Sequence, residues 1–250
     1  MLSENKAEEL YQAIIAEDAS RVRELSKDPA VLNRPRTKNP ILMLSDTDNR
    51  YPLEAACATS AELAEILLDA GAEVNVIDPY IKSTPLINTL RARYPERFRI
   101  ARRLIDEGAD VNVIDKNYRA ALNVCVTPSP EDTDAARADQ KELLEYLLKH
   151  SDLKKIESQS RTNPLIEAAK FDNGPALELI AGTGSFSLDG MPNGYTALMA
   201  AAGMGNTAAC QILLNLGADP GVRSPKGETA ADYAGQSGYP ELAELLRAEH

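Results

Sequence analysis

The sequence predicts an all-α fold made of stacked pairs of short helices. Two observations lead to this prediction: apolar residues recur at helical spacing in short stretches, and these stretches return at a nearly constant interval. The clearest stretch covers residues 194–219. Thr196 can cap a first helix, and Gly217 is of the residue type that ends a second one. Between them lie two apolar stripes, Leu198 with Ala201 and Ala202, then Ala209, Ile212, Leu213 and Leu216.

The stretch around Leu198 has copies along the chain. Leu198 lies 33 residues after Leu165 and 33 before Ala231. Leu53 and Leu86 are also 33 residues apart, whereas the two intervals between Leu86 and Leu165 are longer. A pair of short helices cannot bury its apolar face alone, so neighbouring copies must cover one another.

The residues at the repeat boundaries resemble a known family. Thr84-Pro85-Leu86 begins one helix pair, and Gly71-Ala72-Glu73-Val74-Asn75 and Gly108-Ala109-Asp110-Val111-Asn112 end two others. With a period of 33, this pattern resembles the ankyrin repeat over roughly residues 41–249. The resemblance implies a solenoid of helix–turn–helix units joined by short β-turn or hairpin loops. It also implies a concave surface, formed by turn tips and first helices, that binds other proteins.

We expect one continuous solenoid over residues 1–250. Helices over residues 4–17 and 19–27 form an N-terminal cap within residues 1–40, and residues 33–50 are expected to be loop because prolines interrupt any period. Five repeats follow, and a C-terminal cap with a polar outer face ends the array. These segments are 41–78, 79–115, 116–159, 160–192, 193–226 and 227–250.

Composition narrows the classes of partner. A net charge of −11 argues against nucleic acid, because binding a phosphate backbone needs a positive surface. No apolar run is long enough to span a membrane, and the first residues do not resemble a secretory signal. Three cysteines at helix positions are expected to be buried thiols. We therefore expect a cytoplasmic monomer that binds neither nucleic acid nor membrane. The cysteines are Cys57, Cys125 and Cys210.

Catalytic chemistry has little material in this chain. The only histidines are His150 and His250, so a nucleophile–histidine arrangement is not expected. No cysteine pair has the spacing of a metal site. We expect a non-enzyme without cofactor or metal.

An arginine-rich stretch in the second repeat suggests an alternative function. Six arginines fall within thirteen residues, and the turn that holds them is three residues longer than the family pattern. Arginine binds carboxylates and phosphates through two parallel hydrogen bonds, so the cluster could sense a small anionic or phosphorylated ligand. Pairing with carboxylates of the chain itself is the other interpretation. The arginine cluster comprises Arg91, Arg93, Arg97, Arg99, Arg102 and Arg103.

An acidic, proline-containing insertion follows in the third repeat. It covers residues 127–134, within a longer acidic stretch that reaches residue 140. Because it lies next to the arginine-rich repeat, we expect Glu131, Asp132 or Asp134 to pair with the arginine cluster.

The leading functional prediction is a non-catalytic protein-interaction module, acting as an inhibitor or immunity-type protein that blocks its partner. The resemblance places binding on turn tips and first helices. Tyrosine and arginine, which dominate binding hot spots, occur there, and the tips are locally basic, so an acidic partner surface is expected. The predicted residues are Tyr80, Lys82, Arg91, Lys116, Tyr118, Arg119, Arg161, Asn193, Tyr195, Met204 and Lys226.

Overall fold

The computed structural model describes residues 2–35 and 51–248. Every regular element in these ranges is a helix, as the sequence predicts. Most of the loop expected over residues 33–50 lies outside the described residues. No helix in the described ranges is long and apolar enough to cross a lipid bilayer.

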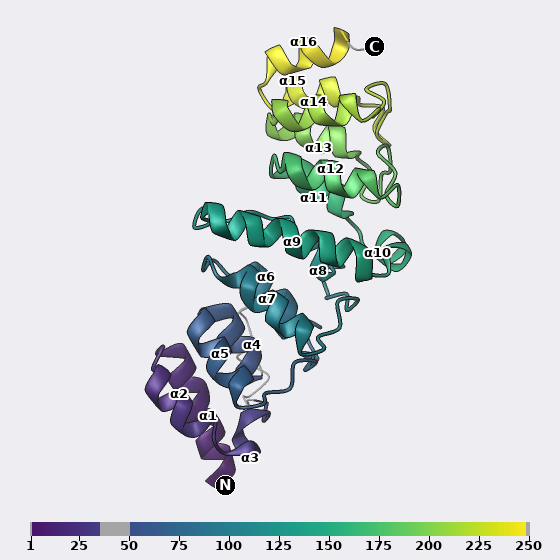
Figure 1. The fold of residues 1–250 in the computed structure, drawn as a ribbon. Coiled ribbons are helices and arrows are strands. Elements are labelled where there is room, and N and C mark those ends of the chain that lie inside the picture. Colours follow the sequence, from purple (N-terminus) through teal and green to yellow (C-terminus); the bar gives the residue numbers. More distant parts are fainter. Residues whose placement is uncertain (1, 36–50, 249–250) are drawn as a thin grey trace. The chain divides into compact units, whose positions relative to one another are not determined.

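The chain divides into two compact units, and the boundary crosses helix α9 (Asp134–His150). Unit 1 comprises Met1–Asn117 and Ser129–Asp139. Its first helices α1, α4 and α6 pack on one another in order, and its second helices α2, α5 and α7 do the same (Figure 1). The helices of this unit are α1 (Leu2–Ile15), α2 (Ala19–Leu25), α3 (Pro29–Leu32), α4 (Pro52–Thr59), α5 (Ala61–Asp69), α6 (Pro85–Arg91) and α7 (Arg97–Asp106).

Unit 2 comprises Tyr118–Pro128 and Gln140–His250. Its first helices α8, α11, α13 and α15 pack in order, and the second helices α12 and α14 pack beside them (Figure 1). The helices other than α9 are α8 (Ala121–Cys125), α10 (Leu153–Gln159), α11 (Pro164–Lys170), α12 (Gly174–Gly182), α13 (Ala197–Met204), α14 (Thr207–Asn215), α15 (Ala230–Gln236) and α16 (Pro240–Ala248). One solenoid over residues 1–250 stays a prediction.

The first helices begin where the sequence predicts. The side chains of Thr84, Asn163 and Thr196 each accept a hydrogen bond from a backbone N–H in the first turn of the following helix. Such a cap contributes about 1 kcal/mol, because those N–H groups have no partner within the helix. Pro52 occupies the first turn of α4, where its missing N–H costs nothing.

The repeated leucines form the core. Leu53, Leu86, Leu122, Leu165 and Leu198 are between 0 and 2% exposed. Each buried leucine contributes roughly 1.5–3 kcal/mol relative to an exposed one. The three cysteines are buried free thiols, as expected, and burial raises the pKa of two of them to about 12. These two are Cys57 and Cys210.

The third repeat differs from the prediction. The stretch expected to be an insertion becomes helical at Asp134, and α9 continues for 17 residues. Thr133 accepts a hydrogen bond from the N–H of Ala136, and the side chains of Ala136 and Gln140 are buried. Alanines in this segment favour the helix, so the insertion shortens to the residues before Asp134. Helix α10, capped by Asp152, was not predicted.

A buried carboxylic acid occupies the first turn of α4. Glu54 is fully buried; its Oε2 accepts a hydrogen bond from the N–H of Tyr51 at 3.4 Å, whereas Oε1 has no partner. Burial, assisted by the negative charge of Asp78, raises the pKa of Glu54 to about 8. In α8 the corresponding residue is Asn123, whose amide donates to the Thr162 carbonyl oxygen at 2.9 Å.

This carboxyl predicts that stability falls as pH rises. The side chain of an unfolded glutamate has its ordinary pKa of 4.5, so the folded state holds a proton that the unfolded state releases up to about pH 8. Stability from this group is complete below pH 4.5 and is lost as pH rises to about 8, by roughly 2–4 kcal/mol. Glu54→Gln should stabilise the chain increasingly over this range in urea unfolding. An equal difference from wild type at pH 5 and pH 9 would show that Glu54 ionises normally.

Two glycines leave room for a neighbouring repeat. A Cβ on Gly205, which has a φ of +76°, would lie 2.4 Å from the ring of Tyr239. A Cβ on Gly174 would lie 2.8 Å from the Cδ1 atom of Ile212. Both distances are shorter than packed carbon atoms tolerate, so each glycine is required by a side chain from the next repeat.

Gly205→Ala should therefore destabilise more than a glycine replacement that meets no neighbour. Gly217, with a φ of +96° and nothing within 4 Å of an added Cβ, is the matched control. The control should cost about 1 kcal/mol from backbone strain, and Gly205→Ala roughly 2–4 kcal/mol, because steric overlap adds to strain. Thermal unfolding of the two variants measures the difference. Equal losses would mean that Tyr239 moves aside freely.

Candidate functional site

The predicted binding residues divide between the two units, and we describe each group separately. Unit 1 holds Tyr80, Lys82, Arg91 and Lys116. Unit 2 holds the larger group, Tyr118, Arg119, Arg161, Asn193, Tyr195, Met204 and Lys226.

In unit 1 the turn before α6 is built on Asp78. Its carboxylate accepts hydrogen bonds from the N–H groups of Tyr80 (2.7 Å) and Ile81 (2.9 Å). The Ile81 carbonyl oxygen then accepts from the N–H of Lys116 at 2.9 Å, which joins two successive tips. Tyr80 stands out from this turn with 57% of its surface exposed. Tyr80 and Lys116 thus belong to one ordered edge.

Arg91 lies at the end of α6 and reaches the next tip. Its guanidinium forms an ion pair with Asp115, whose side chain is buried. Asp115 also accepts a hydrogen bond from the N–H of Asn117 at 2.8 Å. The charge of Arg91 is therefore balanced within the chain, which weakens its case as a contact for an acidic partner.

In unit 2, two predicted residues form a stacked pair. The guanidinium of Arg161 lies 4.3 Å from the ring centre of Tyr118, and its Nη2 lies 3.5 Å from the tyrosine oxygen. Tyr118 has a φ of +61°, a left-handed conformation that is uncommon for a tyrosine. Both side chains are exposed, so the stack orders them on the surface rather than burying them.

A second cation–aromatic pair lies on the following repeat. The Nζ atom of Lys170, at the end of α11, is 5.5 Å from the ring centre of Tyr195 and 3.4 Å from a Glu167 oxygen. Glu167 is buried and also accepts a hydrogen bond from the Thr162 hydroxyl at 2.8 Å. Burial lowers the pKa of Lys170, but its contacts with Tyr195 and Glu167 outweigh this and raise it. Lys170 therefore keeps its charge at neutral pH.

Two exposed apolar side chains lie beside these pairs. Met204, at the end of α13, is 56% exposed, and Phe171, which directly follows α11, is 43% exposed. They are 33 residues apart, and α11 packs against α13, so they occupy equivalent positions on adjacent repeats. The sequence prediction included Met204 and missed Phe171. The 33-residue spacing was the signal that could have found it.

The remaining tip residues of unit 2 lie on turns that touch. A Cβ built on Gly194 would lie 3.4 Å from the Cγ atom of Pro225, so the turn of Asn193 contacts the turn of Lys226. Both of these side chains are exposed. Arg223 begins the second turn, and its guanidinium donates to the Gly227 carbonyl oxygen at 2.7 Å. Successive tips thus make a continuous edge.

The arginine cluster is largely paired with carboxylates of the chain. Besides Arg91, four of its members form ion pairs, which leaves less cationic capacity for a small anion than the sequence suggests. These pairs are Arg97 with Asp132, Arg99 with Glu65, Arg102 with Asp106, and Arg103 with Asp69 and Glu107. The anion-binding alternative stays a prediction with weaker support.

The pair between Arg97 and Asp132 is buried. Both side chains are 1% exposed, and two guanidinium nitrogens donate to the two carboxylate oxygens. The N–H of Ser129 donates to the same carboxylate at 2.7 Å. The expected pairing between insertion and arginine cluster is thus confirmed for Asp132. The other long turn is held by Tyr94, which donates its hydroxyl to the Cys57 carbonyl oxygen at 2.8 Å.

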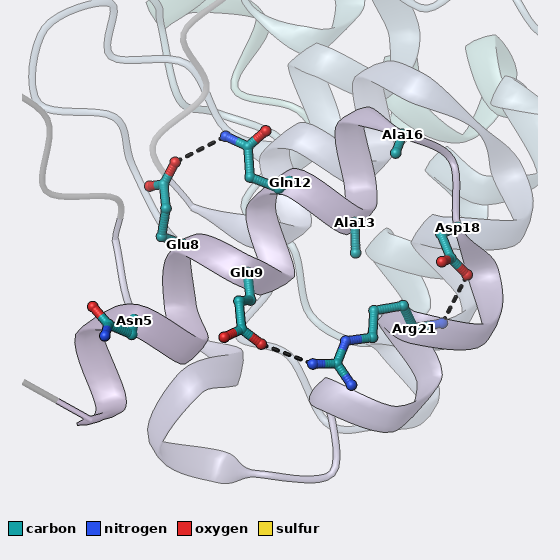
Figure 2. A pocket seen from close by; sticks show the side chains of 8 residues that line it. All are labelled: Asn5, Glu8, Glu9, Gln12, Ala13, Ala16, Asp18 and Arg21. Atoms are coloured by element: carbon teal, nitrogen blue, oxygen red, sulfur yellow. Dashed lines mark hydrogen bonds and ion pairs between the residues drawn. The ribbon is translucent and has the colours of Figure 1, made fainter.

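A shallow polar hollow on α1 and α2 is separate from the predicted residues (Figure 2). Arg21 forms ion pairs with Glu9 (2.8 Å) and Glu24 (2.6 Å), and its N–H donates to Asp18 at 2.9 Å. These contacts pair the charges that line the hollow, so it has the character of a solvated outer face. Among the described residues, no group of three or more His, Cys, Asp or Glu side chains could hold a metal ion.

The buried ion pair predicts a large effect of a single substitution. Asp132→Ala leaves the Arg97 charge buried without its partner, and the free energy of unfolding should fall by about 3–5 kcal/mol. Asp134→Ala, which removes an exposed carboxylate two residues away, should change it by less than about 0.5 kcal/mol. Replacing both partners, with Arg97→Met and Asp132→Ala, should restore much of the loss. Equal effects of the two alanine variants in urea unfolding would contradict this account.

Comparisons with known proteins agree with this geometry. A family model described as ankyrin repeats (3 copies) matches residues 133–224 and 178–250. Among solved structures, the ankyrin repeat protein EF0377 is 29% identical with a TM-score of 0.57, covering 74% of this chain and 90% of that one. An ankyrin repeat domain from Acinetobacter baumannii is 25% identical with a TM-score of 0.58, covering 80% and 97%. The human ASB11 ankyrin repeat domain is 20% identical with a TM-score of 0.66, covering 95% and 96%.

A curated relative matches over a short segment. The ARF GTPase-activating protein GIT1 of human, mouse and rat is 47% identical over 53 residues. The match covers 21% of this chain and 7% of GIT1, so the chain spans only a small part of that relative. The repeat spacing, the capped first helices, the family model and the similar structures agree, and the chain is an ankyrin-repeat protein.

Proposed function

We propose that this chain binds a protein partner through the exposed tips and first-helix ends of unit 2. Ankyrin repeats are generally protein–protein interaction modules without catalytic activity. We call the relevant residues the unit 2 tip surface: Tyr118, Arg161, Lys170, Tyr195 and Met204. The observation that carries the proposal is the presence of two cation–aromatic pairs beside an exposed methionine.

The unit 2 tip surface has the composition of a binding hot spot. Tyrosine and arginine supply large contact areas, and methionine adapts to irregular apolar surfaces. The contacts of Arg161 with Tyr118 and of Lys170 with Tyr195 order four long side chains before any partner arrives. Less conformational entropy is then lost on binding.

The charge of this region favours an acidic partner. Positive side chains line it, whereas the whole chain carries a net charge of −11. The carboxylate of Glu167 is buried beneath Lys170 and does not face solvent. A partner that presents carboxylates would be attracted to this edge and repelled by the rest of the chain. The positive residues are Arg119, Arg161, Lys170, Arg223 and Lys226.

Blocking of the partner is the form of activity that we propose. A rigid recognition edge without catalytic groups can act by covering the surface that it binds, as an inhibitor or immunity-type protein does. We propose that it acts as a monomer in the cytoplasm. Three free, buried cysteines are consistent with a reducing compartment.

Charge reversal on the unit 2 tip surface should weaken partner binding. Affinity capture from a lysate of the source cell, with quantitative mass spectrometry, would identify proteins held by the wild type. For such a protein, Arg161→Glu should slow association roughly tenfold at low salt and reduce its salt dependence. Lys154→Glu, which reverses an exposed charge in the first turn of α10, is the matched control.

Aromatic truncation separates contact from charge. Tyr118→Ala with Tyr195→Ala should cost about 2 kcal/mol or more of binding free energy, mainly through faster dissociation. Tyr146→Ala removes a partly exposed tyrosine on α9, which stacks on His150, and should leave binding unchanged. If the tip variants bind like wild type while a partner is still captured, the site lies elsewhere.

A further inference from the structure

The chain contains two Asn-Gly dipeptides, and the structure holds them differently. They are Asn173-Gly174, before α12, and Asn193-Gly194, on the tip before α13. Asparagine followed by glycine is chemically labile, because glycine has no side chain to hinder attack by its own backbone nitrogen on the asparagine side chain.

The first of these dipeptides is locked. The Asn173 side chain accepts a hydrogen bond from the N–H of Ala176 at 3.2 Å and donates one to the Val126 carbonyl oxygen at 3.0 Å. Gly174 packs so closely on Ile212 that no Cβ would fit. To react, Asn173 would have to give up both side-chain hydrogen bonds.

The second dipeptide is open. Asn193 is exposed, and its side chain makes no hydrogen bond to the described residues. The N–H of Gly194 donates to the Met191 carbonyl oxygen at 3.1 Å, a bond within one exposed turn. Opening of this turn therefore disturbs no buried group.

We infer that Asn193 is a site of spontaneous deamidation, whereas Asn173 is protected. Hydroxide removes the Gly194 amide proton, and the nitrogen attacks Cγ of Asn193. The new N–Cγ bond closes a succinimide ring, the Cγ–Nδ2 bond breaks, and ammonia leaves. Water then opens the ring at either carbonyl, giving aspartate or isoaspartate. The amide nitrogen is exchanged for a water oxygen, and nothing is oxidised or reduced.

The modification would change the charge of the proposed binding edge, a consequence that rests on the proposed function. The turn of Asn193 touches the turn of Lys226, so a carboxylate would appear beside a positive side chain. The isoaspartate product would also lengthen the backbone just before the Thr196 cap of α13. Both products should weaken association with an acidic partner, and the effect should grow as the protein ages.

Peptide mass spectrometry tests the site without any partner. The full chain is incubated at mildly alkaline pH and physiological temperature, and conversion is followed in the peptides that contain each asparagine. Asn193 should convert about 25-fold faster than Asn173, because Asn173 must break two hydrogen bonds that each contribute about fivefold. In concentrated urea the two rates should become similar. Equal rates in the folded chain would overturn the inference.

A variant and a denatured control complete the test. Asn193→Gln should remove the fast phase, because closure of a six-membered ring is much slower. If the ratio of rates is the same in urea as in the folded chain, the difference does not arise from the fold and the structural argument is wrong. Asn193→Asp, compared with Asn193→Gln in partner binding, reports the charge effect, so failure of the binding proposal would not be confused with failure of the modification.

Discussion

A pair of helices of seven to nine residues cannot be stable alone. Isolated helices of this length are marginal in water, because nucleation costs more than a few hydrogen bonds return. Stability therefore comes from apolar faces that neighbouring pairs cover, and the repeated leucines, all nearly inaccessible to solvent, lie at those contacts. Because the core is committed to stacking, the surface left for recognition is the turn tips and the exposed ends of the first helices.

Charge is distributed according to the same division. In unit 1, arginines and carboxylates on successive second helices pair with each other, as Arg99 does with Glu65 and Arg103 with Asp69. The buried pair of Arg97 and Asp132 holds the insertion against α7. In unit 2, the cations at the tips contact aromatic rings rather than exposed carboxylates. An arginine-rich sequence therefore has a mainly structural role in this chain, and fewer, scattered cations form the better recognition surface.

Much of the fold could be predicted because its signals are local. The cap at Thr196 and the buried Leu198 depend on residues within one turn, and the 33-residue period extends them along the chain. The length of α9 was missed because the proline-containing residues before Asp134 obscured the start of a helix that its alanines favour. The choice of Asp132 over Glu131 depends on burial, which spacing does not encode. The state of Glu54 likewise depends on its distance from solvent and from Asp78.

The glycines that accommodate neighbours limit how this array can change. Repeats with one period look interchangeable, so duplication, deletion or exchange of a module should be a simple way to alter such a protein. Gly174, however, fits the Ile212 side chain of the following repeat, and Gly205 fits Tyr239 of the one after that. A transplanted repeat would meet the wrong neighbour on at least one side. Each junction in unit 2 is therefore individually matched, and recombination between repeats would require compensating changes at both ends.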